Sequence, residues 1–146
     1  MSLPQKHILQ RDIRHTVSTE PNGEILLSAT MEDPYHDMEL HITVSRALLL
    51  EDIELIWRKS PSPHCQDITR QLETLKGTSI GHGIVRRVCE TLGGSSGCGN
   101  LRSILLGLLP LAINAHAAYG HSEEAEMYAA MDARMRGVCA GFPKET

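Results

Sequence analysis

The first third of the chain alternates apolar and polar residues with a period of two, which is typical of β-strands that bury one face. Ile13, His15 and Val17 share one face of the first predicted strand. Pro21-Asn22-Gly23 follows with the turn chemistry of a hairpin, in which Gly23 can take a positive φ. The same alternation predicts a second strand over residues 24–31 and a third that places Met38, Leu40, Ile42 and Val44 on one face.

Residues 50–58 fit two patterns. Leu50, Ile53 and Trp57 suit a helix, whereas Ile53, Leu55 and Trp57 suit a strand. We favour a fourth strand. Ser60-Pro61-Ser62-Pro63 then ends the β region, because proline lacks the N–H that a strand ladder needs and restricts the residue before it.

Helical spacing begins after this proline-rich break. Ile68, Leu72 and Leu75 predict an amphipathic helix of about three turns that stops at Gly77. The apolar residues of 80–92 predict a second helix, which is followed by a glycine-rich loop over residues 93–99.

Two further helices are predicted in the last third of the chain. Residues 100–119 are apolar on most sides, and Pro110 is expected to kink or split this third helix. Ser122 is expected to cap a fourth helix, which ends before Gly137 and leaves an irregular tail.

These patterns predict an α+β fold, in which an antiparallel sheet of three to four N-terminal strands packs against C-terminal helices. The 146 residues suit a single domain, 1–146, and its core must be aliphatic because the chain has only one Phe, one Trp and three Tyr. A formal net charge of −4 argues against nucleic acid as a partner. The apolar run 104–118 is shorter than the ~20 residues of a membrane span. Residues 1–14 lack the apolar region of a secretory signal, so we expect a cytoplasmic protein without a membrane partner.

Eight His and four Cys are the candidates for chemistry, since these side chains bind soft or borderline metals and react near neutral pH. Cys98 lies near the end of the glycine-rich loop and is expected at a helix N-terminus, where amide groups and the helix dipole stabilise a thiolate. Cys65 is expected to open the first helix, beside His64. Two thiols that converge with an imidazole suit zinc, iron or an iron–sulfur cluster, although the chain has no Cys-x-x-Cys spacing. The alternative is that the cysteines are small apolar residues of the core.

The turn before the third strand holds further candidates. Asp33, His36 and Asp37 stand at the tip of a hairpin, where they are placed to supply an imidazole or a carboxylate to the thiol pair. The alternative is an ordinary Asx-turn with a solvated histidine. The predicted ligands of a zinc or iron ion are therefore Cys65, Cys98, His36, His64 and Asp37.

Four short motifs occur along the chain in a recognisable order: Asp33…His36-Asp37-Met38, Pro63-x-Cys65, Leu75-x-Gly77 and Gly93-Gly94…Gly97-Cys98-x-x-Leu101. Together they resemble an uncharacterised bacterial family, known only as a domain of unknown function. The resemblance runs over residues 14–118, and its most specific part is the Gly-Cys-x-x-Leu sequence. Members of that family often carry His where this chain has Asn100, a departure that would remove a polar group.

More distantly, the order of hairpins, a Cys at a helix start and a second Cys opening a later helix looks like the iron–sulfur scaffold and sulfur-acceptor proteins of the NifU and SufE type. This likeness implies a small antiparallel sheet packed against helices, with His36, Cys65 and Cys98 near the three ligand positions. The first ligand is a thiol in those scaffolds and is missing here. The likeness therefore favours a single metal ion or a one-thiol sulfur carrier over a cluster.

The sequence leads to one leading hypothesis and two alternatives. The leading hypothesis is a domain that binds a metal ion or handles sulfur through Cys65 and Cys98, together with a sulfur-transfer or metal-delivery partner. The first alternative is a non-catalytic binding or self-association module, such as a homodimer formed through residues 104–118 and the methionines of the last helix. The second is a thiol-dependent enzyme with one of the same two cysteines as nucleophile.

Overall fold

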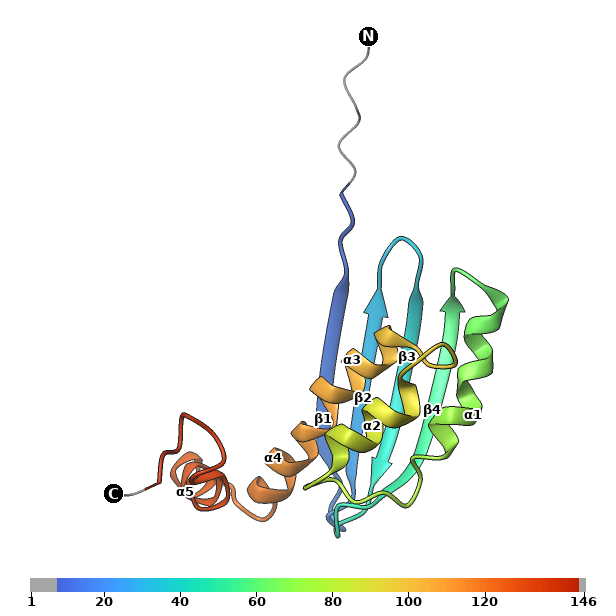
Figure 1. Cartoon of the computed structure of the whole chain (residues 1–146). Coiled ribbons are helices and arrows are strands. Elements are labelled where there is room, and N and C mark those ends of the chain that lie inside the picture. The colour runs from blue at the N-terminus through green and yellow to red at the C-terminus, as the bar shows by residue number, and fades with distance from the viewer. Residues whose placement is uncertain (1–7, 145–146) are drawn as a thin grey trace.

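The computed structural model describes residues 8–144. Its four strands form one antiparallel sheet in the order β1-β2-β3-β4, so each strand pairs with its neighbour in sequence (Figure 1). The predicted α+β fold is confirmed, and residues 50–58 belong to a strand. The strands are β1 (Asp12–Thr19), β2 (Ile25–Glu32), β3 (Asp37–Val44) and β4 (Leu50–Lys59).

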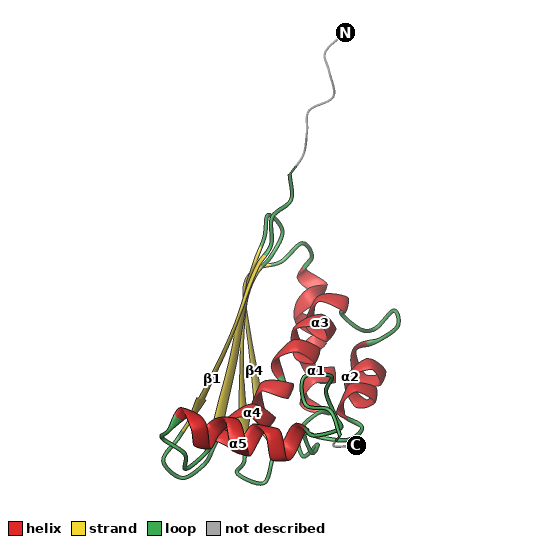
Figure 2. Ribbon diagram, turned by 90° about the vertical axis from the view of Figure 1, so that its left-hand side faces the viewer, coloured by secondary structure: helices red, strands yellow, loops and turns green. Residues whose placement is uncertain are grey.

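The helices follow the sheet in sequence, and all but the last lie on one of its faces, while the other face stays open (Figure 2). The last helix lies beyond the β1 edge of the sheet (Figure 1). The predicted break at Pro110 is confirmed, since Pro110 occupies the first turn of a separate helix. The helices are the 3-10 helix η1 (Pro63–Ile68) and the α-helices α1 (Thr69–Glu73), α2 (Ile84–Leu92), α3 (Gly99–Leu108), α4 (Pro110–Ala118) and α5 (Glu124–Met135).

Three helix predictions were wrong in detail. The first predicted helix is a 3-10 turn followed by a single short α-helix, η1 and α1. The second begins at Ile84 instead of Ile80, because the backbone N–H of Ile80 donates to the carbonyl of Leu48 at 2.7 Å and Gly83 has φ 90°. The last helix begins after Glu123, whose side chain makes no capping hydrogen bond, so Ser122 is not its cap.

The aliphatic core lies between the sheet and the helices. Alternate residues of β2 and β3 point into it, which explains the period of two in the sequence. The helices contribute the other half, chiefly from α3, in which Leu101, Ile104, Leu105 and Leu108 are buried. Because α3 is anchored in this way, its N-terminus has a fixed position relative to the sheet.

One helical stretch, Gly99–Ala118, is long and apolar enough to cross a membrane by length and composition alone. In the structure this stretch consists of α3 and α4, and α3 packs against β1 and β2 through buried side chains. A core helix of a globular domain has the same composition, so the stretch carries no argument for a membrane span.

Gly107 allows α3 to approach β1 closely. A Cβ at this position would lie 2.7 Å from Cε1 of His15, whose Nε2 is buried without a hydrogen-bond partner and whose pKa is lowered by burial. Alanine normally stabilises a helix interior by about 1 kcal/mol relative to glycine. We therefore expect Gly107→Ala not to raise the free energy of unfolding measured in urea. In a His15→Ala background, which removes the close contact, the same substitution is expected to raise it by about 1 kcal/mol. An equal gain in both backgrounds would contradict the close approach.

Candidate functional site

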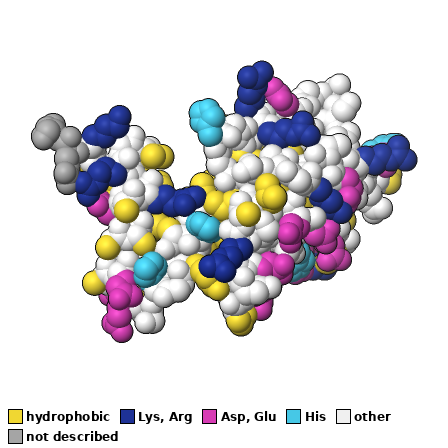
Figure 3. Space-filling view, turned by 90° about the horizontal axis from the view of Figure 1, so that it is seen from below, with side chains coloured by type: hydrophobic (Ala, Val, Ile, Leu, Met, Phe, Trp, Pro, Cys, Tyr) yellow, Lys and Arg dark blue, Asp and Glu magenta, His cyan; other side chains and the backbone are white. Residues whose placement is uncertain are grey.

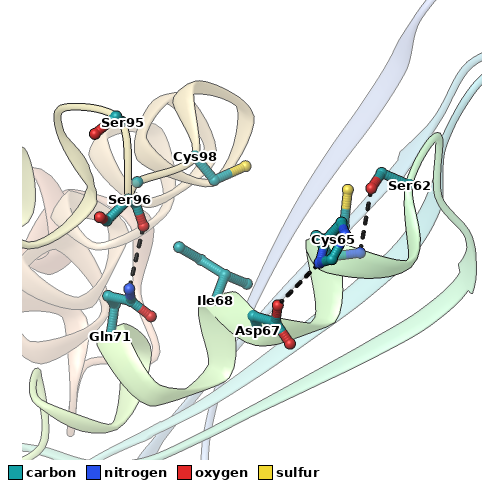
Figure 4. A pocket seen from close by; sticks show the side chains of 10 residues that line it. Ser62, Cys65, Asp67, Ile68, Gln71, Ser95, Ser96 and Cys98 are labelled. Atoms are coloured by element: carbon teal, nitrogen blue, oxygen red, sulfur yellow. Dashed lines mark hydrogen bonds and ion pairs between the residues drawn. The ribbon is translucent and has the colours of Figure 1, made fainter.

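Cys65 and Cys98 lie far apart in the sequence but line the same pocket, which has a volume of about 430 Å³. Both thiols are free and half-buried. In Figure 4 the sulfur of Cys98 points from the start of α3 toward the side of the pocket formed by η1, which carries Cys65. We call this the thiol pocket, and its lining residues are Ser62, His64, Cys65, Asp67, Ile68, Gln71, Ser95, Ser96, Gly97 and Cys98.

The Ser-Pro-Ser-Pro segment positions Cys65. Oγ of Ser62 accepts a hydrogen bond from the backbone N–H of His64 at 3.2 Å, which caps η1. Pro63 stands in the first turn, where no intrahelical N–H is needed. The N–H of Cys65 then donates to the carbonyl of Ser62 at 3.2 Å. The segment that follows the sheet therefore also begins η1, the 3-10 helix that carries Cys65.

The glycine-rich loop positions Cys98. The backbone N–H of Cys98 donates to the carbonyl of Leu92 at 3.0 Å, which closes the loop on the end of α2. Gly97 passes so close to this carbonyl that a Cβ would lie 1.9 Å from its oxygen. Nε2 of Gln71 donates to the carbonyl of Ser96 at 3.1 Å and so ties α1 to the loop (Figure 4). The two walls of the thiol pocket are thereby joined.

Cys98 occupies the N-cap position of α3 with an extended backbone (φ −141°, ψ 113°). Its side chain makes no capping hydrogen bond, so the sulfur is available to a ligand. The first-turn amides of a helix carry partial positive charge and favour an anion nearby. A negatively charged sulfur at this position therefore has favourable electrostatics.

A second polar cluster lies at the start of α3 and joins the residue before β1, the β2–β3 turn and α3. Oδ2 of Asp33 accepts a hydrogen bond from Nε of Arg11 at 2.8 Å and forms an ion pair with Nη2 of Arg11, also at 2.8 Å. Nη1 of Arg11 donates to Oδ1 of Asn100 at 2.9 Å, and Nδ2 of Asn100 lies 3.2 Å from Nε2 of His36. Nδ1 of His36 closes the ring of contacts on Oδ1 of Asp33 at 2.9 Å. We call these four side chains the Asp33 network.

The contacts of the Asp33 network determine the tautomer of His36. Because the oxygen of Asn100 accepts from Arg11, the amide nitrogen of Asn100 must face His36 and donate to it. Nε2 of His36 is then the acceptor, and the proton stands on Nδ1, which donates to Asp33. Both ring nitrogens of this buried histidine are therefore engaged.

Asp33 is a fully buried carboxylate. Burial alone raises its pKa, but the hydrogen bonds from His36, from Arg11 and from the backbone N–H groups of Tyr35 and His36 outweigh burial and hold the pKa far below its usual range. Asp33 is thus ionised at neutral pH and pairs with the guanidinium of Arg11.

Three of the five predicted ligands are brought together. Cys65, Cys98 and His64 line the thiol pocket, although the His64 side chain is 87% exposed and its Nδ1 lies 3.5 Å from a carboxylate oxygen of Asp67. The other two are used elsewhere. His36 belongs to the Asp33 network, and Asp37 pairs with Nε of Arg58 at 3.0 Å. Neither of these two lines the thiol pocket.

The family assignment rests on one comparison. A family model described as a protein of unknown function (DUF2889) matches residues 9–114. The chain belongs to this family. No curated protein and no solved structure matches the chain. The predicted resemblance to a family of unknown function is confirmed, whereas the likeness to the NifU and SufE type stays a prediction.

The DUF2889 match extends from just before β1 into α4. It therefore includes both the thiol pocket and the Asp33 network, and it leaves α5 outside. The prediction of a single domain over residues 1–146 reaches beyond the matched region and stays a prediction.

Sequence reasoning missed Arg11 and misjudged Asn100. Arg11 precedes the first strand and has no motif around it, so only the folded structure brings it to Asp33. Asn100 was expected to cost the site a polar group relative to His. Instead its amide bridges Arg11 and His36 with one acceptor and one donor. The signal that was available is the position of Asn100 in the first turn of α3, two residues after Cys98.

The thiol pocket contains side chains of the types that bind metal ions. Among residues 8–144, no three His, Cys, Asp or Glu side chains stand close enough together to hold a metal ion. The donor types at the thiol pocket, two thiols with an imidazole and a carboxylate, are those that zinc prefers. The types therefore suit zinc, but their arrangement offers two thiols and no third ligand beside them.

Proposed function

We propose that the thiol pocket handles sulfur, with Cys98 as the acceptor of a sulfur atom from a partner protein and Cys65 as a second thiol. The observation that carries this proposal is that two of the four cysteines, from η1 and from the start of α3, line one pocket. Cys89 and Cys139 are exposed and line neither side of it.

The chemistry of the proposed step balances. The thiolate of Cys98 attacks the outer sulfur of a persulfide on the donor, so a new sulfur–sulfur bond forms at Cys98 and the donor's sulfur–sulfur bond breaks. The donor leaves as a thiolate, and Cys98 carries a persulfide anion. The first-turn amides of α3 stabilise that anion, because they lie next to Cys98 and carry partial positive charge.

A zinc or iron ion held by Cys65 and Cys98 is the second candidate. The observation in its favour is that His64 and Asp67 also line the thiol pocket and are of the remaining donor types, although both side chains have to move to reach an ion held by the two thiols. Either function needs reduced thiols, so we propose a reducing compartment such as the cytoplasm. The expected partner is accordingly a sulfur-transfer or a metal-delivery protein.

The test uses the full chain purified without oxygen in a Cys89→Ser/Cys139→Ser background, which leaves only the two pocket thiols. After incubation with inorganic polysulfide and desalting, we expect mass spectrometry to find one added sulfur on Cys98. Cys98→Ala is expected to abolish this uptake, and Cys65→Ala is expected to retain part of it.

Each outcome of this experiment decides between the candidates. Uptake that persists in Cys98→Ala would contradict the proposed acceptor. Stoichiometric zinc or iron in the untreated protein, lost on replacement of either pocket cysteine, would establish the metal candidate instead. Metal-free protein whose pocket thiols take up no sulfur would overturn both.

A further inference from the structure

The α4–α5 hairpin lies at the β1 edge of the sheet, where α4 packs against β1 and β2. α5 packs against α4 at the edge of the sheet (Figure 1), and none of the residues of α5 is buried. In α4 only Ala112 is buried. Both helices therefore leave apolar side chains half-covered, which is unusual because packing of an apolar face supplies most of the stability of a helix in a protein.

An open groove runs between the two helices. Its volume is about 560 Å³, and its walls are mainly apolar. Figure 3 shows a lobe of the molecule that a hollow separates from the larger body, with hydrophobic side chains on the surface beside the hollow. Tyr128 stands at the edge of this groove with 63% of its surface exposed. The lining residues are Asn114, Ala118, Glu124, Met127, Tyr128 and Met131.

The outer side of α5 is suited to close contact with another helix. Ala125, Ala129 and Ala133 are all exposed and recur every four residues, so they form one row of small side chains on the helix surface. Small side chains let two helix backbones approach each other. The groove and this row give α5 two strips of apolar or small side chains, which its charged residues Glu124, Glu126, Asp132 and Arg134 flank.

The charges on α5 indicate what covers it. Glu124 and Glu126 stand in its first turn, and Arg134 stands in its last turn. Two copies of α5 that pack in antiparallel orientation place the acidic end of each against the basic end of the other. A parallel pair would bring like charges together. A second copy of this chain in antiparallel orientation is therefore complementary to α5 in charge.

We propose that the α4–α5 hairpin is a self-association surface, which binds the same hairpin of a second copy with the two α5 helices antiparallel. The arrangement is a two-fold one, in which the same residues serve on both sides. It buries Tyr128, the groove and the alanine row of each copy. α5 lies outside the region that the family model matches, and the groove shares no lining residue with the thiol pocket.

Sedimentation of the full chain over a range of concentrations tests the proposal. We expect a reversible dimer whose dissociation constant rises about tenfold or more in Tyr128→Glu, since a charge replaces a central aromatic contact. Val85→Glu is the matched control, because Val85 on α2 is similarly exposed, at 58%, and lies away from the hairpin. A strict monomer, or a dimer equally sensitive to both variants, would overturn the proposal.

Charge reversal tests the antiparallel orientation. Glu126→Lys and Arg134→Glu are each expected to weaken self-association, and an equimolar mixture of the two variants is expected to restore a dimer of one copy of each. A mixture that stays monomeric would overturn the orientation and with it the proposal. So would a monomeric wild-type chain that binds phosphatidylcholine–phosphatidylglycerol vesicles, since the apolar surface would then face lipid.

Discussion

Replacing Gly97 by alanine is expected to disorganise the loop before α3 and to lower the free energy of unfolding by about 1–3 kcal/mol, the usual cost of overpacking. A Cβ at this position would lie 1.9 Å from the carbonyl oxygen of Leu92 and 2.7 Å from that of Gly93. Neither oxygen can yield easily, because both belong to the backbone. The loop must therefore move, and it is expected to lose the hydrogen bond from Cys98 to Leu92.

The same substitution is expected to alter the thiol pocket, because Gly97 lies next to Cys98 and both line it. Urea unfolding measures the loss of stability, and the alkylation rate of Cys98 measures the change at the pocket. Gly99→Ala is the matched control, since a Cβ there meets only the end of Arg102, at 3.9 Å. If the Gly97 and Gly99 variants are equally stable and equally reactive, the close approach to Leu92 is wrong.

The strands were predictable because a local pattern determines them. The period of two placed the second strand at residues 24–31, and the structure has β2 at Ile25–Glu32. The start of α2 was not predictable in this way. Ile80 suits a helix by spacing, but its N–H bonds to Leu48, and the N–H of Leu50 bonds to the carbonyl of Thr78. These partners are distant in sequence, so periodicity carries no information about them.

The candidate site shows the same difference between features that local sequence determines and features that distant contacts determine. Cys65 and Cys98 were placed at helix starts by proline and glycine signals, and the structure has them there. His36 was predicted as a displayed ligand, because hairpin tips are usually solvated. Its ring is buried instead, since Arg11 and Asn100 reach it and Asp33 from remote elements. Convergence of this kind depends on tertiary packing and has no sequence period.

The Asp33 network is expected to dominate the loss of stability in acid. Folding lowers the pKa of Asp33, so the unfolded chain binds more protons than the folded chain between the two pKa values. The contribution of Asp33 is then complete above the unfolded value, at about pH 4, and is lost as the pH falls toward the folded value. Protonation removes the charge that pairs with Arg11 and an acceptor that the buried backbone amides need.

Asp33→Asn is therefore expected to be less stable than the wild type at neutral pH and to depend less on pH below about pH 4, because its amide does not titrate in that range. Asparagine is also a poor replacement, since it offers one oxygen where Asp33 uses two and turns an NH₂ group toward a donor. Urea unfolding at several pH values measures both effects.

Asp12→Asn is the control, because Asp12 is an exposed carboxylate next to Arg11 in sequence. If the free energy of unfolding falls equally steeply with pH below about pH 4 in the wild type and in Asp33→Asn, the network does not determine the acid stability. If it falls less steeply in Asp33→Asn alone, the buried carboxylate holds together the turn before β3, the start of β1 and the start of α3.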